Sequence, residues 1–194
     1  MEATTTKMLR LEALKNGAIW GAVNIVLLVA VWYIAPSLLS SYWYAGIQFV
    51  IGIALASFFC LDLRKKAGGY WSFSEALWPI FAMFLTNMAL ALIFTTVFGK
   101  FIDPSYATYM KEKAVESTVK MMETMGASQD VIDTQLEAAE ERFEKQFNPG
   151  LGDFIQAFGI TAIFYFIGAL IFALIFKKTD PNPWASQEDE VVQG

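Results

Sequence analysis

The sequence contains no histidine and a single cysteine, Cys60. Histidine is the most common general base and a leading ligand for haem iron and transition metals, so its absence removes most chemistry of those kinds. One cysteine cannot form an intrachain disulfide, a zinc cluster or a dithiol redox pair. The chain also lacks a compact, strongly basic region, which argues against a nucleic-acid partner. We therefore expect no metal site, no cofactor and no nucleic acid.

Charged residues are absent from four long stretches of the chain: 17–34, 43–61, 76–98 and 154–176. Hydrophobic residues make up 56% of the sequence and the mean hydropathy is +0.44, which is more apolar than an ordinary soluble domain. A helix needs roughly 20 apolar residues to cross a bilayer. We predict an all-α integral membrane protein with four transmembrane helices, whose first partner is the lipid bilayer.

The charges outside these stretches predict the topology. Basic residues precede the first stretch, fill the second loop at 64–66 and follow the last stretch at Lys177 and Lys178. The first loop is uncharged, and segment 99–153 carries more acids than bases. By the positive-inside rule, both termini and the second loop are predicted to be cytoplasmic, and segment 99–153 to be extracytoplasmic.

Aromatic residues gather at the predicted membrane surfaces. Trp32 and Trp43 lie at the outer ends of the first two stretches, and Tyr70 and Trp71 precede the third. Amphipathic rings are typical of headgroup depth, so we expect these residues to anchor the helices at the two interfaces.

The outer segment has the pattern of two helices. The first is predicted to begin with Asp103 as its N-cap and Pro104 at the first helical position, and Ser128 caps the second. Each helix has one apolar seam with spacings of three and four residues, as a paired hairpin requires. The seams are Ala107, Met110, Ala114, Met121 and Met125, and Ile132, Leu136, Ala139, Phe143 and Phe147. Because the core between two such helices is thin, we expect the hairpin to pack against the outer ends of the spans, a second copy or another protein.

The predicted organisation follows from these assignments. It comprises a cytoplasmic N-terminal segment (1–16), transmembrane helices 1 and 2 (17–61), a cytoplasmic loop (62–75), transmembrane helix 3 (76–98), the extracytoplasmic helical hairpin (99–153), transmembrane helix 4 (154–176) and a disordered cytoplasmic tail (177–194). The acidic, proline-containing composition of the last residues is typical of disorder.

Glu75 is an acid directly ahead of the third span. Ser72 and Glu75 form the S-x-x-E pattern of a capping box. Pro79 removes one helical hydrogen bond and its ring conflicts with the Glu75 carbonyl, so we predict a kink there. One interpretation is a polar notch for a headgroup or a cation. The pattern favours the other interpretation, which is helix initiation at the inner interface.

Polar residues and glycines within the spans allow two readings each. Gly17 and Gly21 form a G-x-x-x-G pattern, which suits close packing either inside the bundle or in a dimer. The polar side chains can line a substrate path, but hydrogen bonding between helices is the favoured interpretation. They are Asn24, Gln48, Thr86, Asn87, Thr95, Thr96 and Gln156. With no ionisable group at membrane depth, a proton relay lacks its usual parts.

Four acids of the outer segment recur along one helical face. They are Asp133, Glu137, Glu140 and Glu144. Calcium prefers several oxygen ligands, but the backbone-wrapping loop of a calcium site is absent from this pattern. A solvated helical face is therefore the favoured interpretation.

Three motifs support a resemblance to a known family. They are KNGAIWGAVNIV at the first span, GYWSFSEAL at the start of the third, and FIDPSY just after it. With a variable charged outer segment and an aromatic-rich last span, the chain resembles, from about Lys7 to Lys178, the small bacterial inner-membrane proteins of domain of unknown function 4199. The resemblance implies four spans and a location in the bacterial cytoplasmic membrane. It implies no catalytic residue.

Together these features favour a non-enzymatic accessory or scaffold subunit that binds a partner protein, or a second copy, through the outer hairpin. Glu75 and Asp103 are the best acids for catalysis, but they are predicted to lie on opposite sides of the membrane. The alternative is an oligomeric small transporter or a handler of lipid-linked substrates.

Overall fold

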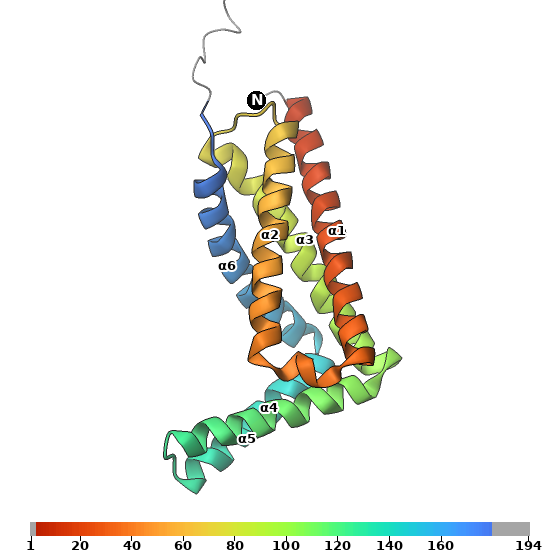
Figure 1. The fold of residues 1–194 in the computed structure, drawn as a ribbon, viewed down its shortest axis with the longest axis vertical. Coiled ribbons are helices and arrows are strands. Elements are labelled where there is room, and N and C mark those ends of the chain that lie inside the picture. Colours follow the sequence, from red (N-terminus) through yellow and green to blue (C-terminus); the bar gives the residue numbers. More distant parts are fainter. Residues whose placement is uncertain (1–2, 180–194) are drawn as a thin grey trace, which may run out of the picture.

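The structure is a computed structural model that describes residues 3–179. Within that range the chain is all-α, and four of its helices are long and apolar enough to cross a membrane (Figure 1). These four are α1 (Ala3–Ile34), α2 (Tyr42–Lys66), α3 (Phe73–Val97) and α6 (Leu151–Phe176). Two further helices, α4 (Pro104–Thr124) and α5 (Gln129–Phe147), lie between α3 and α6 in the chain. The predicted class, an all-α membrane protein with four spans and two helices between the third and fourth, is confirmed.

Two short turns complete the path of the chain. A 3₁₀ turn, η1 (Pro36–Ser40), joins α1 to α2, and a π turn, η2 (Phe98–Ile102), joins α3 to α4. α3 runs as one helix through the buried Pro79, and the kink at this residue stays a prediction.

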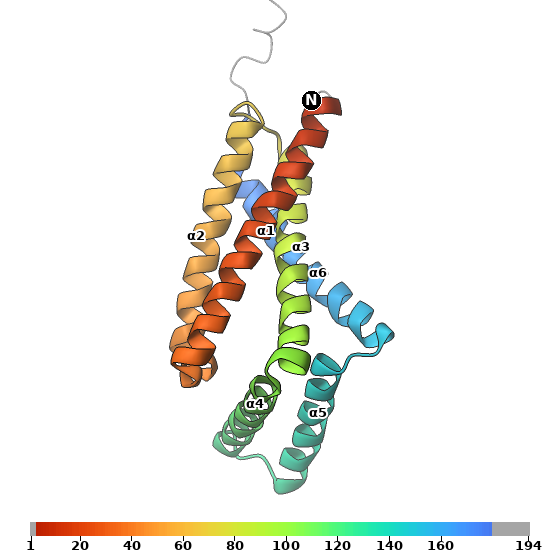
Figure 2. The ribbon, with the colours of Figure 1, turned by 90° about the vertical axis from the view of Figure 1, so that its right-hand side faces the viewer.

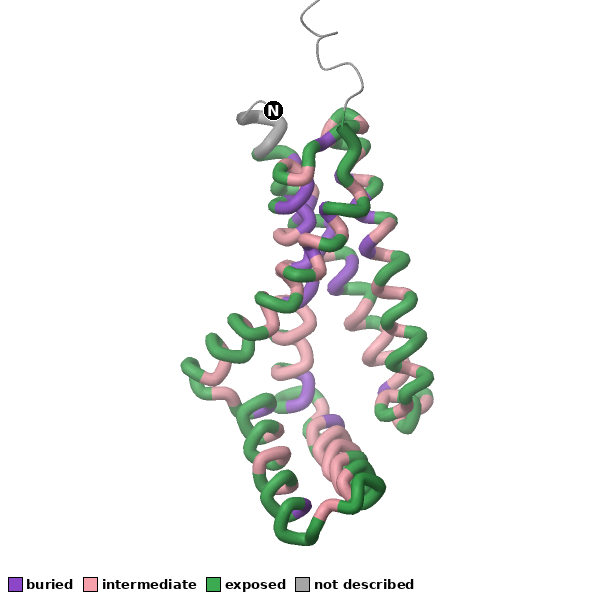
Figure 3. Tube along the Cα trace, turned by 90° about the vertical axis from the view of Figure 1, so that its left-hand side faces the viewer, coloured by how far each residue is buried: buried purple, intermediate pink, exposed green. Residues whose placement is uncertain are grey.

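α3 is the central helix of the membrane bundle. It packs most extensively against α1 and α6, and Figure 2 shows it between the two. α2 is buried mainly in its second half, at Ala56, Phe59, Cys60 and Leu63. Buried residues are concentrated toward the end of the bundle that holds the N-terminus, as Figure 3 shows. The other end is held more loosely and carries the two extra helices.

The G-x-x-x-G pattern lies in the contact between α1 and α3. A methyl group added at Gly17 would fall well inside van der Waals distance of the Met83 carbonyl oxygen, and 2.8 Å from Cβ of Thr86. At Gly21 an added methyl group would lie 3.0 Å from the Leu90 side chain. Both glycines are therefore used within the chain, where they let two helix backbones approach closely.

The loop before α3 and the end of α6 are joined at the N-terminal end of the bundle. Trp71 and Lys178 exchange two backbone hydrogen bonds of 2.9 and 3.0 Å. The indole N–H of Trp71 donates to the Phe176 carbonyl (2.8 Å), and the ring is only 2% exposed. One expectation is corrected: Lys178 is bonded to the bundle instead of belonging to a disordered tail. Trp71 is in addition a core residue, which the sequence did not indicate. Residues 180–194 of that predicted tail lie outside the described residues.

The α4–α5 pair, here called the arm, extends sideways from the opposite end of the bundle (Figure 1). The predicted seam of α5 is at least half-buried along its length, and Ile132 and Phe147 are fully buried. The predicted seam of α4 is wrong in its second half, because Met121 and Met125 are exposed. The half-buried positions there include Thr118 and Met122 instead. The predicted and the observed buried positions of α4 both have helical spacing, so periodicity alone could not distinguish between them.

Candidate functional site

The base of the arm is fixed to the bundle by an aromatic cluster. Its buried members are Trp32 of α1, Phe98 of η2, Tyr106 of α4 and Phe147 of α5. Their rings meet edge to face, with centroids 5.3 Å apart for Trp32 and Tyr106 and 6.1 Å apart for Tyr106 and Phe147. Trp32 is buried because the arm covers it, which the predicted position at headgroup level did not indicate. The cluster makes the base of the arm a rigid junction.

Asp103 adds a polar connection to this junction. Its carboxylate accepts from the backbone N–H of Ser105 (3.2 Å) and from the Ser105 hydroxyl, so it is the N-cap of α4, with Pro104 in the first turn. It also accepts from the indole N–H of Trp32 (2.8 Å). The hydrogen bonds from Ser105 and Trp32 hold the pKa of Asp103 below its usual value. One side chain thus starts the arm and ties it to α1.

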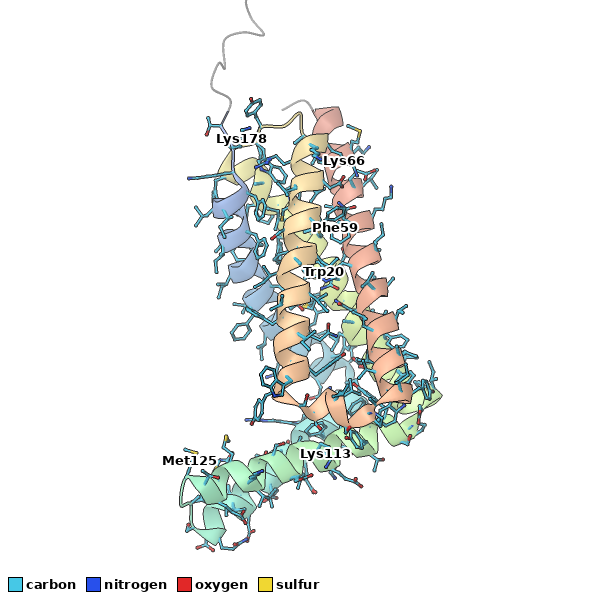
Figure 4. All side chains as sticks on the ribbon, in the orientation of Figure 1. Trp20, Phe59, Lys66, Lys113, Met125 and Lys178 are labelled. Carbon is cyan, nitrogen blue, oxygen red and sulfur yellow. The ribbon has the colours of Figure 1, made fainter. Side chains whose placement is uncertain are left out.

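The far part of the arm leaves a groove beside the start of α2. This arm groove has a volume of about 430 Å³. Its lining includes Tyr42, Lys113, Glu116, Lys120, Met121 and Met125, and Lys113 pairs with Glu116 (2.6 Å). Tyr42 is 93% exposed and Met125 is 73% exposed, and Figure 4 shows Met125 near the tip of the arm. Flexible methionines and an aromatic ring beside lysines are typical of a surface that accepts a partner.

A second hollow lies inside the membrane bundle. This membrane cavity has a volume of about 460 Å³ and is lined by α1, α2, α3 and α6. Its aromatic lining consists of Trp20, Phe49, Phe84, Phe164, Tyr165 and Phe172. Three amide side chains, Asn24, Gln48 and Asn87, also reach it. The combination of apolar walls and a few polar groups is typical of small-molecule sites.

The structure divides the polar residues of the spans into two groups. Asn24 Nδ2 donates to Asn87 Oδ1 (2.9 Å) and joins α1 to α3, whereas Gln48 Nε2 donates to the Tyr44 hydroxyl (2.8 Å) within α2. The hydroxyls of Thr86, Thr95 and Thr96 also bond to carbonyls of their own helix. Thr96 has a second, longer bond of 3.5 Å to the Gln146 carbonyl of α5. Gln156 lies in a separate surface hollow that Thr96 also lines.

Trp20 is a residue of the membrane cavity that the sequence did not single out. Its ring packs edge to face on Phe84, with centroids 5.5 Å apart. Its indole N–H is buried and has no hydrogen-bond acceptor among the described residues. A lone tryptophan inside an apolar stretch gives no sequence signal of this kind, because its environment depends on how four helices pack.

Glu75 completes the predicted capping box. The backbone N–H and the hydroxyl of Ser72 donate to Glu75 Oε2 (2.8 and 2.9 Å), and the Glu75 N–H faces the Ser72 hydroxyl at 3.4 Å. This is the geometry of helix initiation. Glu75 and Asp103 lie at opposite ends of the α3–η2 segment, so the structure does not bring the two acids together.

An ionic cluster near the N-terminal end ties α1 to α2. Lys66 pairs with Glu12 (2.6 Å) and with Asp62 (2.8 Å), and Asn16 Nδ2 donates to Asp62 Oδ2 (2.8 Å). Sequence reasoning missed this cluster, because it joins residues of two helices whose relative placement the sequence does not give. Figure 4 shows Lys66 at this end of the bundle.

The acid-rich face of α5 is solvated. Its four acids are exposed, and three of them are paired with other side chains. Asp133 accepts from Gln129 (3.0 Å), Glu140 pairs with Lys111 (3.4 Å) and Glu144 accepts from Asn148 (3.1 Å). Within residues 3–179, no group of three or more histidine, cysteine, aspartate and glutamate side chains is arranged to hold a metal ion.

These features define the chain as a multi-pass α-helical membrane protein with a two-helix arm. It belongs to the family described as protein of unknown function (DUF4199), whose model matches residues 15–178. The matched region contains the four membrane helices from Lys15 onward and the arm, and it ends at the residue that pairs with Trp71. Comparison with curated proteins and with solved structures found no match.

Proposed function

We propose that this protein is a non-enzymatic accessory or scaffold subunit of the bacterial cytoplasmic membrane, and that its arm binds a partner protein of the same membrane. The arm groove is the observation that carries this proposal. Met121 and Met125 are not needed for the contact between α4 and α5, yet they lie exposed beside Tyr42. Exposed apolar groups gathered at one place mark interaction surfaces more often than scattered ones do.

The construction of the arm supports this role. Its base is held by the aromatic cluster and by Asp103, whereas its tip projects beyond the bundle (Figure 1). A rigidly based arm presents its groove in a fixed orientation, which lowers the entropic cost of binding. The groove lies between α4 and the membrane end of α2, so a partner that enters it also lies close to the membrane.

The charge distribution supports an extracytoplasmic arm with both termini in the cytoplasm. Lysines and arginines flank the N-terminal end of the bundle, and the arm carries an excess of acids. The partner would then present its binding segment on the outer side of the membrane.

Affinity purification after crosslinking in intact membranes tests the proposal. The variant carries Met121→Glu and Met125→Glu, and Val131→Glu is the matched control because Val131 is an exposed apolar residue of the arm outside the groove. Wild type and control are expected to recover the same partner, and the double variant is expected to lose it. Recovery of one partner by all three proteins, or no partner with wild type, would contradict the proposal.

An oligomeric small transporter or a handler of lipid-linked substrates is the second candidate, and the membrane cavity favours it. The notion of an oligomer joined through Gly17 and Gly21 is weakened, because both glycines face α3. Native mass in detergent and identification of retained lipids would test this candidate. A monomer that retains no lipid would argue against it.

A further inference from the structure

We propose that the membrane cavity binds a quinone, a neutral membrane-dissolved molecule with a flat conjugated ring, two carbonyl oxygens and an apolar tail. This inference does not depend on the arm and goes beyond the proposed scaffold role. Three properties of the cavity carry it: its depth and neutrality, its aromatic walls and its free hydrogen-bond donors.

The cavity lies deep in the bilayer and carries no charge. Asn24, on its floor, is about midway along the membrane-embedded part of α1, roughly 10–15 Å from either end at 1.5 Å per residue. None of the described residues that line the cavity is ionisable at neutral pH. A phosphate headgroup at this depth would be costly without a cationic partner. The ligand therefore has to be neutral and soluble in the membrane.

Six of the thirteen residues that line the cavity are aromatic. Phe84 is the centre of this arrangement, with ring centroids 5.5 Å from Trp20, 5.4 Å from Phe172 and 6.3 Å from Tyr165. Aromatic side chains favour stacked or edge-to-face contact with another flat ring. The volume of about 460 Å³ falls in the range of small-molecule sites. These walls suit a conjugated ring better than they suit a saturated chain.

One buried donor at the cavity lacks an acceptor among the described residues, and the Asn24–Asn87 pair leaves a second donor without an assigned bond. Trp20 is 7% exposed and its N–H has no acceptor among the described residues. The bond from Asn24 to Asn87 leaves the NH₂ of Asn87 for another partner. The bilayer interior offers no water to satisfy such donors. The carbonyl oxygens of a quinone would accept from them, whereas the ester oxygens of a phospholipid lie near the membrane surface.

The cavity has a lateral opening to the lipid. Phe49 of α2 and Phe164 of α6 belong to its lining and are 70% and 69% exposed. Between these helices, Gly52 leaves space, because a methyl group added there would meet nothing within 4 Å. A ligand dissolved in the bilayer can therefore enter between α2 and α6 without passing through water.

Binding of a defined probe to the full chain tests the inference. Purified protein in phosphatidylcholine nanodiscs is incubated with decylubiquinone, or with decylbenzene, which has the same tail and no carbonyl group. Retained probe is quantified by mass spectrometry after gel filtration, and the thermal unfolding midpoint is recorded. Wild type is expected to retain decylubiquinone in preference to decylbenzene, and to unfold at a higher temperature with it.

Two pairs of variants assign the binding to the cavity. Gly52→Leu fills it and is expected to lower retention at least about ten-fold, whereas Gly46→Leu, on the same helix with open space and outside the cavity, retains the probe. Trp20→Phe removes one donor and keeps a ring, so affinity is expected to fall about three- to ten-fold. Trp78→Phe, at a lipid-exposed position, is its control.

Equal retention of the probe by wild type, Trp20→Phe and Gly52→Leu would overturn the inference, because it would mean that the probe dissolves in the lipid. Equal retention of decylbenzene and decylubiquinone would also overturn it, since the cavity would then hold only hydrocarbon chains. If Gly52→Leu fails to fold by circular dichroism, the comparison of Trp20→Phe with Trp78→Phe decides.

Discussion

Replacing Gly17 with alanine should weaken the contact between α1 and α3. The new methyl group would overlap the backbone carbonyl oxygen of Met83 and would lie 2.8 Å from Cβ of Thr86. Carbon atoms in contact normally lie about 3.5–4.0 Å apart. The overlapping group is backbone, so it cannot rotate away as the end of a flexible side chain could. The two helices must separate by roughly 0.5–1 Å to fit the methyl group.

The net cost follows from two opposing effects. Overpacking of a tight contact typically costs about 1–3 kcal/mol. Alanine regains up to about 1 kcal/mol, because glycine is the poorer helix former. With the middle of the first range, about 2 kcal/mol, the expected loss in the free energy of unfolding is about 1–2 kcal/mol. The separation would also strain the hydrogen bond from Asn24 to Asn87, which is 2.9 Å long and two turns further along α1.

Thermal unfolding in detergent, followed by circular dichroism, measures this loss. For a chain of this size the midpoint should fall by roughly 2–8 °C. Gly46→Ala is the control, because an added methyl group there meets nothing within 4 Å. Gly17→Ala as stable as Gly46→Ala would refute the packing argument. A change in native mass without loss of stability would instead assign the glycines to a dimer contact.

Three further predictions concern polar contacts. Because the pKa of Asp103 is lowered, its ionised form stabilises the folded arm above pH about 4, and that contribution is lost as the pH falls through the folded-state pKa. In a variant that keeps Trp32 as its one tryptophan, quenching of the fluorescence by an aqueous quencher should rise in acid. Quenching that does not change with pH would count against this. Ser72→Ala should lower the free energy of unfolding by about 1 kcal/mol. Glu75→Gln keeps the cap and should lower it by less, as chemical denaturation would show. Equal losses of stability in the two variants would give the charge of Glu75 a further role. Lys66→Met leaves Glu12 and Asp62 without their shared cation. It should destabilise the folded protein by up to about 1 kcal/mol, and by less in high salt. A loss of stability that does not depend on salt would exclude an ionic origin.

The sequence predicted the features that depend on local chemistry. The four spans follow from the absence of charge over long stretches, and the capping box at Ser72 and Glu75 follows from their spacing. The start of the arm at Asp103 has the same origin, because a capping side chain acts within three residues. The orientation of the arm and the burial of Trp32 could not be predicted, since both depend on contacts between distant segments.

The candidate sites were predictable only in part. Asn24 and Asn87 stood out as polar residues in apolar stretches, but that they bond to each other depends on the register of α1 and α3. Met121 and Met125 were assigned to the seam because their spacing is helical, and only the packing of α4 against α5 shows them exposed. The burial of Trp71 could not be predicted, because the sequence cannot show that Lys178 returns to pair with it.

Site-specific photo-crosslinking in living cells tests the central claim, which is that the arm groove binds a partner protein. A photoreactive amino acid replaces Met125, and in a matched experiment it replaces Val131 outside the groove. The account predicts a discrete protein adduct from position 125 and none from position 131. Adducts from position 125 with lipid alone, or identical adducts from both positions, would contradict it.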